Sequence, residues 1–340
     1  MLDNAKFVRS YIKIGYRSMA IRDALLSRMT LKQIRLVVAL QQHGSVLAAG
    51  RAIGLSQPAA TRMLRELEHN LDATLFSRTN RGVVATEWGS ALARDARLVL
   101  AQLAHAGEEL DDLSGGTGGR ITVGTLLAAS ARLLPAAIAS LHARRPRLLV
   151  TVVEGTNDRL LPALLTGDLD FIVGRLPELD RGEALIQEPL LVEDSCIVVR
   201  AGHPLARRRR LSLADLTDAS WVFPLPETTL RRHIEQAFRD QGLPVPRPAV
   251  QSLSVLTNRQ LLMGSDMIGI WPRQVVIDDV RNELLRILPV ALAPTAGPIG
   301  ITRRRDAILS PAAQALCDEL RSFADEDAGR LRSRRRPAVA

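Results

Sequence analysis

The chain has 340 residues and a net charge of +9 at neutral pH, with 46% hydrophobic but only 3% aromatic residues. This length suffices for two or three domains, and no apolar run approaches the roughly 18 residues of a membrane-spanning helix. The two cysteines, Cys196 and Cys317, lie far apart without CxxC spacing, which argues against a disulfide framework or a zinc site. We therefore expect a cytoplasmic protein with no cofactor and no bound metal.

The basic residues are concentrated at the two ends of the chain. Residues 1–82 contain 13 Lys and Arg against 5 acidic residues, the last twelve residues contain 5 Arg and no acid, and the segment between is slightly acidic. Neutralising phosphates is the main source of non-specific DNA affinity, so this distribution indicates a DNA-binding N-terminal module. The basic tail, residues 326–340, and the run Arg207–Arg210 are interpreted as solvated segments.

Residues 1–28 form an N-terminal extension to which the sequence assigns no role. They carry charges throughout and lack a continuous apolar core, so they do not predict a secretory signal. The segment AIRDALLSRM is compatible with a helix, and translation from Met19 or Met29 is an alternative.

Residues 44–68 predict two short helices joined by a bend at Gly54. Ser56 suits the N-cap of the second helix because its hydroxyl can accept from a free backbone N–H, and Pro58 suits the first turn. The next apolar residues follow at spacings of four, three and four, which predicts a helix with one packed face: Ala60, Leu64, Leu67 and Leu71.

The other face of this second helix carries side chains of the kinds that read or grip DNA: Gln57, Ala59, Thr61, Arg62 and Arg65. Gln pairs with adenine edges, Arg with guanine or phosphate, and Ala and Thr allow close approach. An amphipathic helical hairpin in an all-α domain is the alternative. The next segment, DATLFSRTNRGVVATE, favours DNA binding, since it predicts a β-hairpin wing with Arg78 and Arg81 beside the groove.

The segment MTLKQIRLVVALQQHGSVLAAGRAIGLSQPAATRMLRELEHNLDATLFSRTNRGVVATEWG resembles the winged helix-turn-helix of the LysR-type bacterial transcription regulators. SQPA, LExxL, LFxR and T-E-x-G carry the resemblance, with the helix-turn-helix at about Val46 to Arg65. It implies base or backbone contacts by Ser56, Gln57, Pro58, Ala59, Thr61, Arg62, Arg65, Arg78 and Arg81. Trp88 departs from the small residues usual at its position, and the 28 preceding residues exceed the usual few.

Residues 87–114 predict one long helix with a seam of apolar residues at alternating steps of four and three, including Leu92, Val99, Leu103 and Leu110. The seam either faces its own domain or pairs with a second chain. We favour pairing, because the helix leaves the winged domain and ends in the linker SGGTGGR. A homodimer would place two recognition helices about one DNA turn apart, on a near-palindromic promoter site.

Residues 120–325 alternate between β-rich apolar strands and helices, which predicts buried parallel strands covered by helices. The order of elements predicts two α/β lobes, lobe I at 120–193 and 298–325 and lobe II at 194–297. The complete prediction is a two-lobed α/β effector domain preceded by an all-α winged helix-turn-helix domain, 29–86, and a dimerisation helix, 87–114.

This two-lobed block is similar to the periplasmic-binding-protein-like effector domain of the LysR family. TVGTLLAAS, GHPLA and ETTLRR resemble in particular the branch that contains galactose-binding-protein regulators. The resemblance implies a sugar or another catabolic metabolite as inducer of transport or catabolic genes. An aromatic or organic acid is the alternative inducer, and the choice between activator and repressor stays open.

In open α/β sheets, ligands bind beyond the carboxyl ends of the strands, where helix N-termini present free N–H groups. Hydroxyls and amides there suit a polyol, and an arginine suits a carboxylate. Ordinary capping or turn formation is the alternative role for each residue. The residues expected at the effector site are Thr125, Thr156, Asn157, Arg175, Pro224, Glu227, Thr228, Ser252 and Ser254.

The sequence does not predict an enzyme. It lacks GxSxG, P-loop and HExxH motifs, and its six histidines are scattered singly, so we assign no catalytic residue. A purely architectural DNA-binding protein would not explain a two-lobed block of about 200 residues. The expected partners are double-stranded DNA, a small-molecule inducer, a second copy of the chain in a homodimer or homotetramer, and RNA polymerase if the protein activates; no membrane partner is expected.

Overall fold

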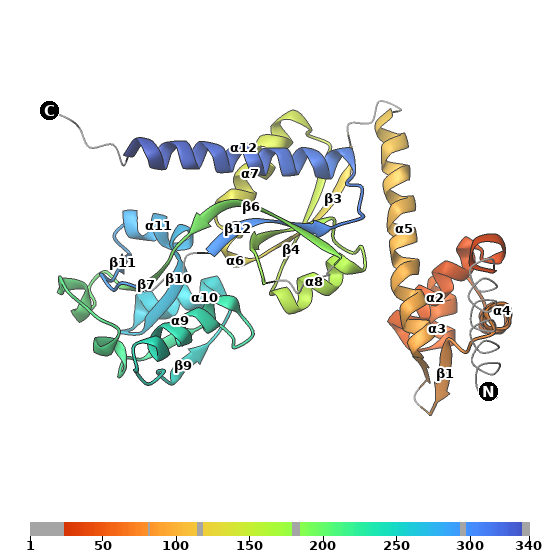
Figure 1. The fold of residues 1–340 in the computed structure, drawn as a ribbon, viewed down its shortest axis with the longest axis horizontal. Coiled ribbons are helices and arrows are strands. Elements are labelled where there is room, and N and C mark those ends of the chain that lie inside the picture. Colours follow the sequence, from red (N-terminus) through yellow and green to blue (C-terminus); the bar gives the residue numbers. More distant parts are fainter. Residues whose placement is uncertain (1–23, 81, 114–117, 179–183, 293–296, 335–340) are drawn as a thin grey trace, which may run out of the picture. The chain divides into compact units, whose positions relative to one another are not determined.

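The computed structural model describes residues 24–80, 82–113, 118–178, 184–292 and 297–334 (Figure 1). The chain divides into two compact units, Met1–Gly107 and Glu108–Ala340. Each unit has hydrophobic cores of its own.

The N-terminal unit contains the predicted helix pair and hairpin. Its elements are α2 (Leu31–His43), α3 (Val46–Ala52), α4 (Gln57–Leu71), β1 (Phe76–Thr79) and β2 (Gly82–Ala85). Gly54 makes the bend with a φ of +73°, a conformation that glycine adopts without steric cost. Ser56 caps α4 by accepting from the Ala59 N–H, and Pro58 occupies the first turn, as predicted.

The apolar stripe of α4 forms the centre of this unit. Ala60, Leu64, Leu67 and Leu71 are all buried, as their spacing predicts. Residues 24–28 are helical, and Ala24 is buried in the same core. The predicted extension 1–28 is therefore not separate over its whole length, because its last residues pack on the winged domain; residues 1–23 lie outside the described part of the chain.

Glu68 fastens the wing to α4. Its Oε1 accepts from the backbone N–H groups of Leu75, at 2.7 Å, and Phe76, at 3.1 Å. Gly89 allows the next helix to approach closely, since a Cβ at that position would collide with the Leu75 carbonyl. The orientation of the hairpin is thus set by a half-buried carboxylate contact and a glycine.

The long helix α5 spans Glu87–Leu113. Near its start Ala93 and Ala96 are buried, and Leu92 packs against the core of the winged domain. Val99, Leu103 and Leu110 are 44%, 50% and 67% exposed. Leu92 therefore contacts its own domain, and the solvent-facing part of the predicted seam begins at Val99.

Lobe I is built on a five-stranded sheet with the order β4-β3-β5-β12-β6. Helices α7 and α12 pack on one face, in the cluster that contains Phe171 and Leu316, and α8 packs on the other through Leu160 and Leu164 (Figure 1). Its elements are β3 (Arg120–Thr125), α6 (Leu127–Ser130), α7 (Leu133–Arg144), β4 (Leu149–Glu154), α8 (Asn157–Leu165), β5 (Phe171–Arg175), β6 (Leu185–Glu193), β12 (Gly297–Arg304) and α12 (Pro311–Arg334).

Lobe II is built on a second five-stranded sheet with the order β11-β7-β10-β8-β9. Helix α9 covers one face, above Trp221 and Phe223, while α10 and α11 cover the face that carries Val198 and Trp271. Its elements are β7 (Ser195–Arg200), two short 3-10 helices η1 (Pro204–Arg207) and η2 (Ala214–Leu216), β8 (Trp221–Phe223), α9 (Thr229–Asp240), β9 (Pro248–Gln251), α10 (Val255–Gly264), β10 (Ile268–Pro272), α11 (Arg273–Arg281) and β11 (Leu285–Ile287).

The chain passes from lobe I to lobe II and later returns, each time through strands that pair antiparallel. β6 ends at Glu193 and β7 begins at Ser195, and the chain returns from β11 to β12. The expectation of parallel strands holds for β3 with β4 and β5 and for β8 with β9 and β10. It is wrong for β12, which pairs antiparallel with β5 and β6, and for β7, which pairs antiparallel with β10 and β11, because β12 and β7 enter their sheets from the opposite lobe.

Helix α12 extends further than predicted. It continues to Arg334, so the backbone of residues 326–334 is helical rather than an irregular tail. Residues 335–340 lie outside the described part of the chain. Within the described residues, no helix combines the length and the apolar character needed to cross a membrane.

Candidate functional site

One face of α4 and the wing carry the residues predicted to contact DNA. Ser56, Gln57, Pro58, Arg62, Arg65 and Arg78 are exposed, and Ala59 and Thr61 are half-buried. Arg81 lies outside the described residues. The face opposite this surface is the buried stripe of α4, so the helix holds the contact groups outward by packing its other side into the core.

The arginines that the structure describes on this surface make no strong ion pair with another residue of the chain. Arg62 lies 3.9 Å from Glu66, and both side chains are more than half exposed. Exposed pairs of this kind contribute about 0–1 kcal/mol, so phosphate can replace the glutamate at little cost. The geometry is that of a helix that can enter the major groove, with an arginine-bearing hairpin beside it.

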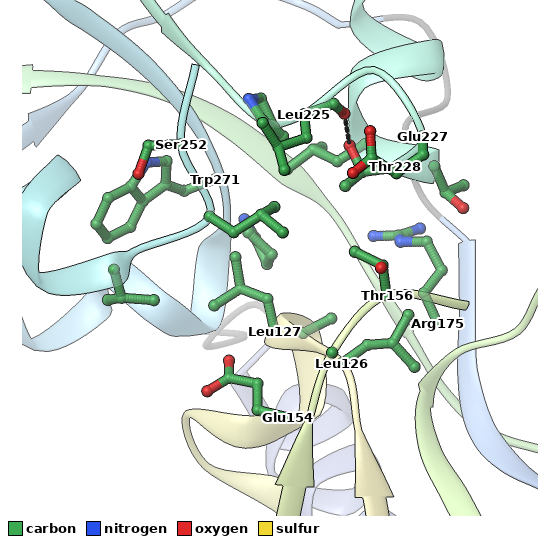
Figure 2. Close-up of a pocket in the computed structure, with 18 of the residues that line it drawn as sticks. Leu126, Leu127, Glu154, Thr156, Arg175, Leu225, Glu227, Thr228, Ser252 and Trp271 are labelled. Carbon is green, nitrogen blue, oxygen red and sulfur yellow. Dashed lines mark hydrogen bonds between the residues drawn. The ribbon is translucent and has the colours of Figure 1, made fainter. Parts of the chain in front are cut away.

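A cavity of about 520 Å³ lies between lobes I and II (Figure 2). Arg175 and Thr156 stand on one side of it, and Trp271 and Ser252 on the opposite side. Leu126, Leu127 and Leu225 contribute apolar surface. This size and this mixture of apolar walls with a few polar groups are typical of small-molecule sites.

Four helices of nine or more residues begin at the cavity. Their N-caps are Thr156 for α8, Thr228 for α9, Ser254 for α10 and Pro272 for α11, and all four line it. A helix N-terminus carries a partial positive charge and free N–H groups, so this convergence favours an anion or a ligand rich in acceptor oxygens.

The structure brings together eight of the nine residues that the sequence predicts for the effector site. Those that line the cavity are Thr156, Asn157, Arg175, Pro224, Glu227, Thr228, Ser252 and Ser254. Thr125 is the exception: its side chain is 1% exposed, its hydroxyl donates to the Leu126 carbonyl, and it does not line the cavity. It lies at the end of a strand, as predicted, but its side chain is buried there.

Several of these polar groups also perform the capping roles that were the alternative interpretation. The hydroxyls of Thr228 and Ser254 accept from backbone N–H groups of their own helices. Thr156, in contrast, makes no side-chain capping bond on α8. Its hydroxyl is therefore the more available of the three for a ligand.

Sequence reasoning missed some of the lining residues. Trp271 lies one residue before the end of β10 and Glu154 ends β4, so both lie where strands end, although the prediction took other residues there. Asn258 lies in the first turns of α10 and is 7% exposed; its Nδ2 donates to the Ser252 carbonyl, and its Oδ1 has no partner among the described residues. No local signal marks Asn258, because helix packing decides that it turns toward the cavity.

Arg175 places a buried positive charge at the cavity. Its guanidinium is buried, and Nη2 donates to the Glu193 backbone carbonyl at 3.3 Å. Burial lowers the pKa of Arg175, while Glu193 and Asp194 oppose that shift. A guanidinium remains protonated in proteins, so the side of the cavity formed by Arg175 and Thr156 presents a cation.

Neither cysteine lines the cavity. Cys196 and Cys317 are both free and buried, and burial raises the pKa of each thiol to about 12. Because the thiolate is the reactive form, both are inert packing residues at neutral pH. In the part of the chain that the structure describes, His, Cys, Asp and Glu side chains do not gather into a group that could hold a metal ion.

Comparison with known families matches both units. Residues 31–90 match the bacterial regulatory helix-turn-helix protein, lysR family, and residues 114–325 match the LysR substrate binding domain. The chain is 34% identical over 302 residues to the HTH-type transcriptional regulator GbpR of Azospirillum brasilense, covering 88% of each chain. It is 36% identical over 242 residues to GbpR of Rhizobium radiobacter, covering 70% of this chain and 80% of that protein.

Solved structures share the fold. A full-length OxyR variant from Pseudomonas aeruginosa superposes with a TM-score of 0.65 at 23% identity, covering 86% of this chain and 95% of that one. Full-length CbnR in complex with its target DNA superposes with a TM-score of 0.50 at 22% identity, covering 87% of this chain and 100% of that one.

Proposed function

We propose that this chain, which belongs to the LysR family of bacterial transcription regulators, controls transcription in response to a small metabolite bound between lobes I and II. It is a DNA-binding helix-turn-helix regulator and not an enzyme, in keeping with its family and its relatives. The observation that carries the metabolite response is the cavity on which four helix N-termini and Arg175 converge.

The DNA contacts are proposed for the exposed face of α4 and for the wing. Gln57 is exposed in the first turn, where a glutamine can make a bidentate pair with an adenine edge. Arg62, Arg65 and Arg78 are exposed and can meet phosphates.

We expect Gln57→Ala to weaken specific operator binding by about 1–3 kcal/mol and to leave non-specific DNA binding nearly unchanged, because only a base contact distinguishes sequences. Competition gel shifts with operator and random duplex measure both affinities. Gln42→Ala is the matched control, since Gln42 is an exposed glutamine on α2 of the same domain. Equal losses on operator and random DNA would rule out a base contact by Gln57.

The proposed assembly is a homodimer paired along the exposed part of α5, which reads a near-palindromic promoter site, with association into a homotetramer as a further step. A regulator of chromosomal promoters acts in the cytoplasm, and RNA polymerase is its partner if it activates. Paired α5 helices would cover the half-exposed apolar residues Val99 and Leu103.

The proposed inducer is a compact polar metabolite, either a sugar or a related catabolic compound, with an aromatic or organic acid as the alternative. Hydroxyls and amides such as those of Thr156 and Asn157 suit a polyol, and Arg175 suits an acidic group. A ligand that binds one arrangement of the lobes tenfold more tightly shifts their equilibrium by about 1.4 kcal/mol, which lies in the usual range for allosteric coupling.

A thermal-shift screen of the full chain against sugars, sugar acids and aromatic acids tests this function. A true inducer at about one hundred times its Kd stabilises the folded state by about 2.7 kcal/mol, which gives a measurable rise in Tm. The same compound must then change the operator gel shift. If no compound of the three classes changes either the Tm or the gel shift, the proposal is refuted.

A further inference from the structure

The first crossing between lobes contains a buried glutamate that the proposed function does not use. Glu193 is the last residue of β6, and its side chain is 4% exposed. Its Oε1 accepts at 2.8 Å from the backbone N–H of Gln274, in the first turn of α11. The N-cap of α11 is Pro272, which supplies no side-chain bond, so a carboxylate from lobe I caps a helix of lobe II.

The other carboxylate oxygen of Glu193, Oε2, is buried without a hydrogen-bond donor among the described residues. The hydroxyl of Ser195, two residues later, is likewise buried and has no hydrogen-bond partner in the described part of the chain. A buried oxygen without a donor disfavours the carboxylate form and leaves a position for a proton. A proton on Oε2 leaves Oε1 free to keep its bond from Gln274.

Arg175 connects this glutamate to the cavity. The guanidinium lines the cavity and donates through Nη2 to the backbone carbonyl of Glu193. Gly297 lies against the other terminal nitrogen, Nη1, and a Cβ there would displace it. The guanidinium is therefore held between the ligand space and the crossing, where its charge acts on both.

From this arrangement we propose that Glu193 is a positioning residue of the ligand site, which takes up a proton on Oε2 when an anion binds beside Arg175. The proton comes from solvent, and no other bond is made or broken. The inference rests on the proposed function only for the identity of the anion; the coupling between Arg175 and Glu193 belongs to the unliganded protein as well.

The electrostatics give the direction of the coupling. Burial raises the pKa of Glu193 to about 7 and is the largest effect. The hydrogen bond from Gln274 and the charge of Arg175 act in the opposite direction and lower this pKa. An anion that neutralises Arg175 removes part of that lowering and adds a like charge nearby, so the pKa of Glu193 rises further. Near and above pH 7, binding of the anion is therefore accompanied by proton uptake, and its affinity falls as the pH rises.

Other charged and titratable groups lie near the pair. Asp194 is the chain neighbour, and it also opposes the carboxylate form of Glu193. Arg273, at the start of α11, and the neutral thiol of Cys196 face the same crossing. Burial and the charges of Arg175 and Arg232 lower the pKa of His233 from 6.5, with Glu178 opposing, so His233 is neutral above pH 7.

The ligand-independent test uses infrared spectroscopy of the full chain to follow the band of the protonated Glu193 carboxyl. This band is assigned as the one that wild type shows and E193Q lacks. We expect this band to titrate with a midpoint at about pH 7. In Arg175→Met the midpoint should move to higher pH, because the lowering charge is gone. An unchanged midpoint in Arg175→Met would overturn the coupling, whether or not any metabolite has been found.

The second test uses the anion that raises the Tm in the screen, titrated calorimetrically from about pH 7 to about pH 9. Its association constant should fall by up to about tenfold per pH unit in wild type and stay flat in Glu193→Gln. Glu188→Gln is the matched control on β6, since the ion pair with Arg321 lowers the pKa of Glu188. The same slope in Glu193→Gln as in wild type would overturn the proposal. A screen in which no compound of any class binds would count against the proposed function, and the infrared titration would still decide the coupling between Arg175 and Glu193.

Discussion

Leu103→Asp is expected to dissociate the dimer and to abolish operator binding at concentrations where the wild type is fully bound. Leu103 is half exposed in the single chain, so the aspartate costs the monomer little. In a dimer paired along α5, the substitution would bury one carboxylate from each chain in the apolar seam. A buried unpaired charge costs about 3 kcal/mol or more, which is roughly a hundredfold or more in the dimer Kd.

Sedimentation velocity measures the assembly, and a gel shift measures operator binding. Ala104→Asp is the matched control, because Ala104 is exposed one residue further along α5 and off the seam. It should leave both properties near wild type. If Leu103→Asp sediments as the wild-type dimer does, the exposed face of α5 is not the pairing surface.

Arg175→Met should cause the largest loss of ligand affinity of any single change in the cavity. The substitution keeps a long, unbranched side chain but removes the buried guanidinium on the side formed by Arg175 and Thr156. Charge-assisted hydrogen bonds contribute about 1.5–3 kcal/mol, so an acidic inducer should bind roughly 10- to 150-fold more weakly. A neutral sugar should lose less, because its hydroxyls have other donors and acceptors at the cavity.

Calorimetry with the inducer found by thermal shift measures this loss. Arg159→Met is the control, since Arg159 also lines the cavity but is exposed, and solvent screens its charge. Arg159→Met should lower the affinity for the inducer less than Arg175→Met does. Equal losses in both variants would show that the inducer responds to the overall charge of the cavity and not to the buried guanidinium.

Local chemistry explains why much of the N-terminal unit was predictable. Ser56 and Pro58 mark the start of α4 and Gly54 marks the bend, and each acts within a few residues of the backbone groups it satisfies. The stripe from Ala60 to Leu71 follows from the helical period alone. The order of strands and helices in the two lobes was predictable for the same reason, because the periodicity of each segment indicates whether it is a strand or a helix.

The position of the cavity followed from a rule about strand ends, and its detailed lining did not. Eight predicted residues meet there because parallel strands end at one edge of a sheet. Thr125 also ends a strand, but its side chain is buried and does not line the cavity. Asn258 reaches the cavity from within a helix, a placement that depends on how α10 packs against β7 and β10.

The sequence by itself determined helix α4 with its one buried face, the hairpin that follows it and the alternation that builds two lobes, since caps, turns and periodicity are local properties. Only the tertiary structure decided that Leu92 packs inward and that β6 and β12 run antiparallel. It alone also placed Glu193 against Gln274, 81 residues further along the chain. These contacts depend on strand pairing and burial between distant segments, which no local pattern encodes.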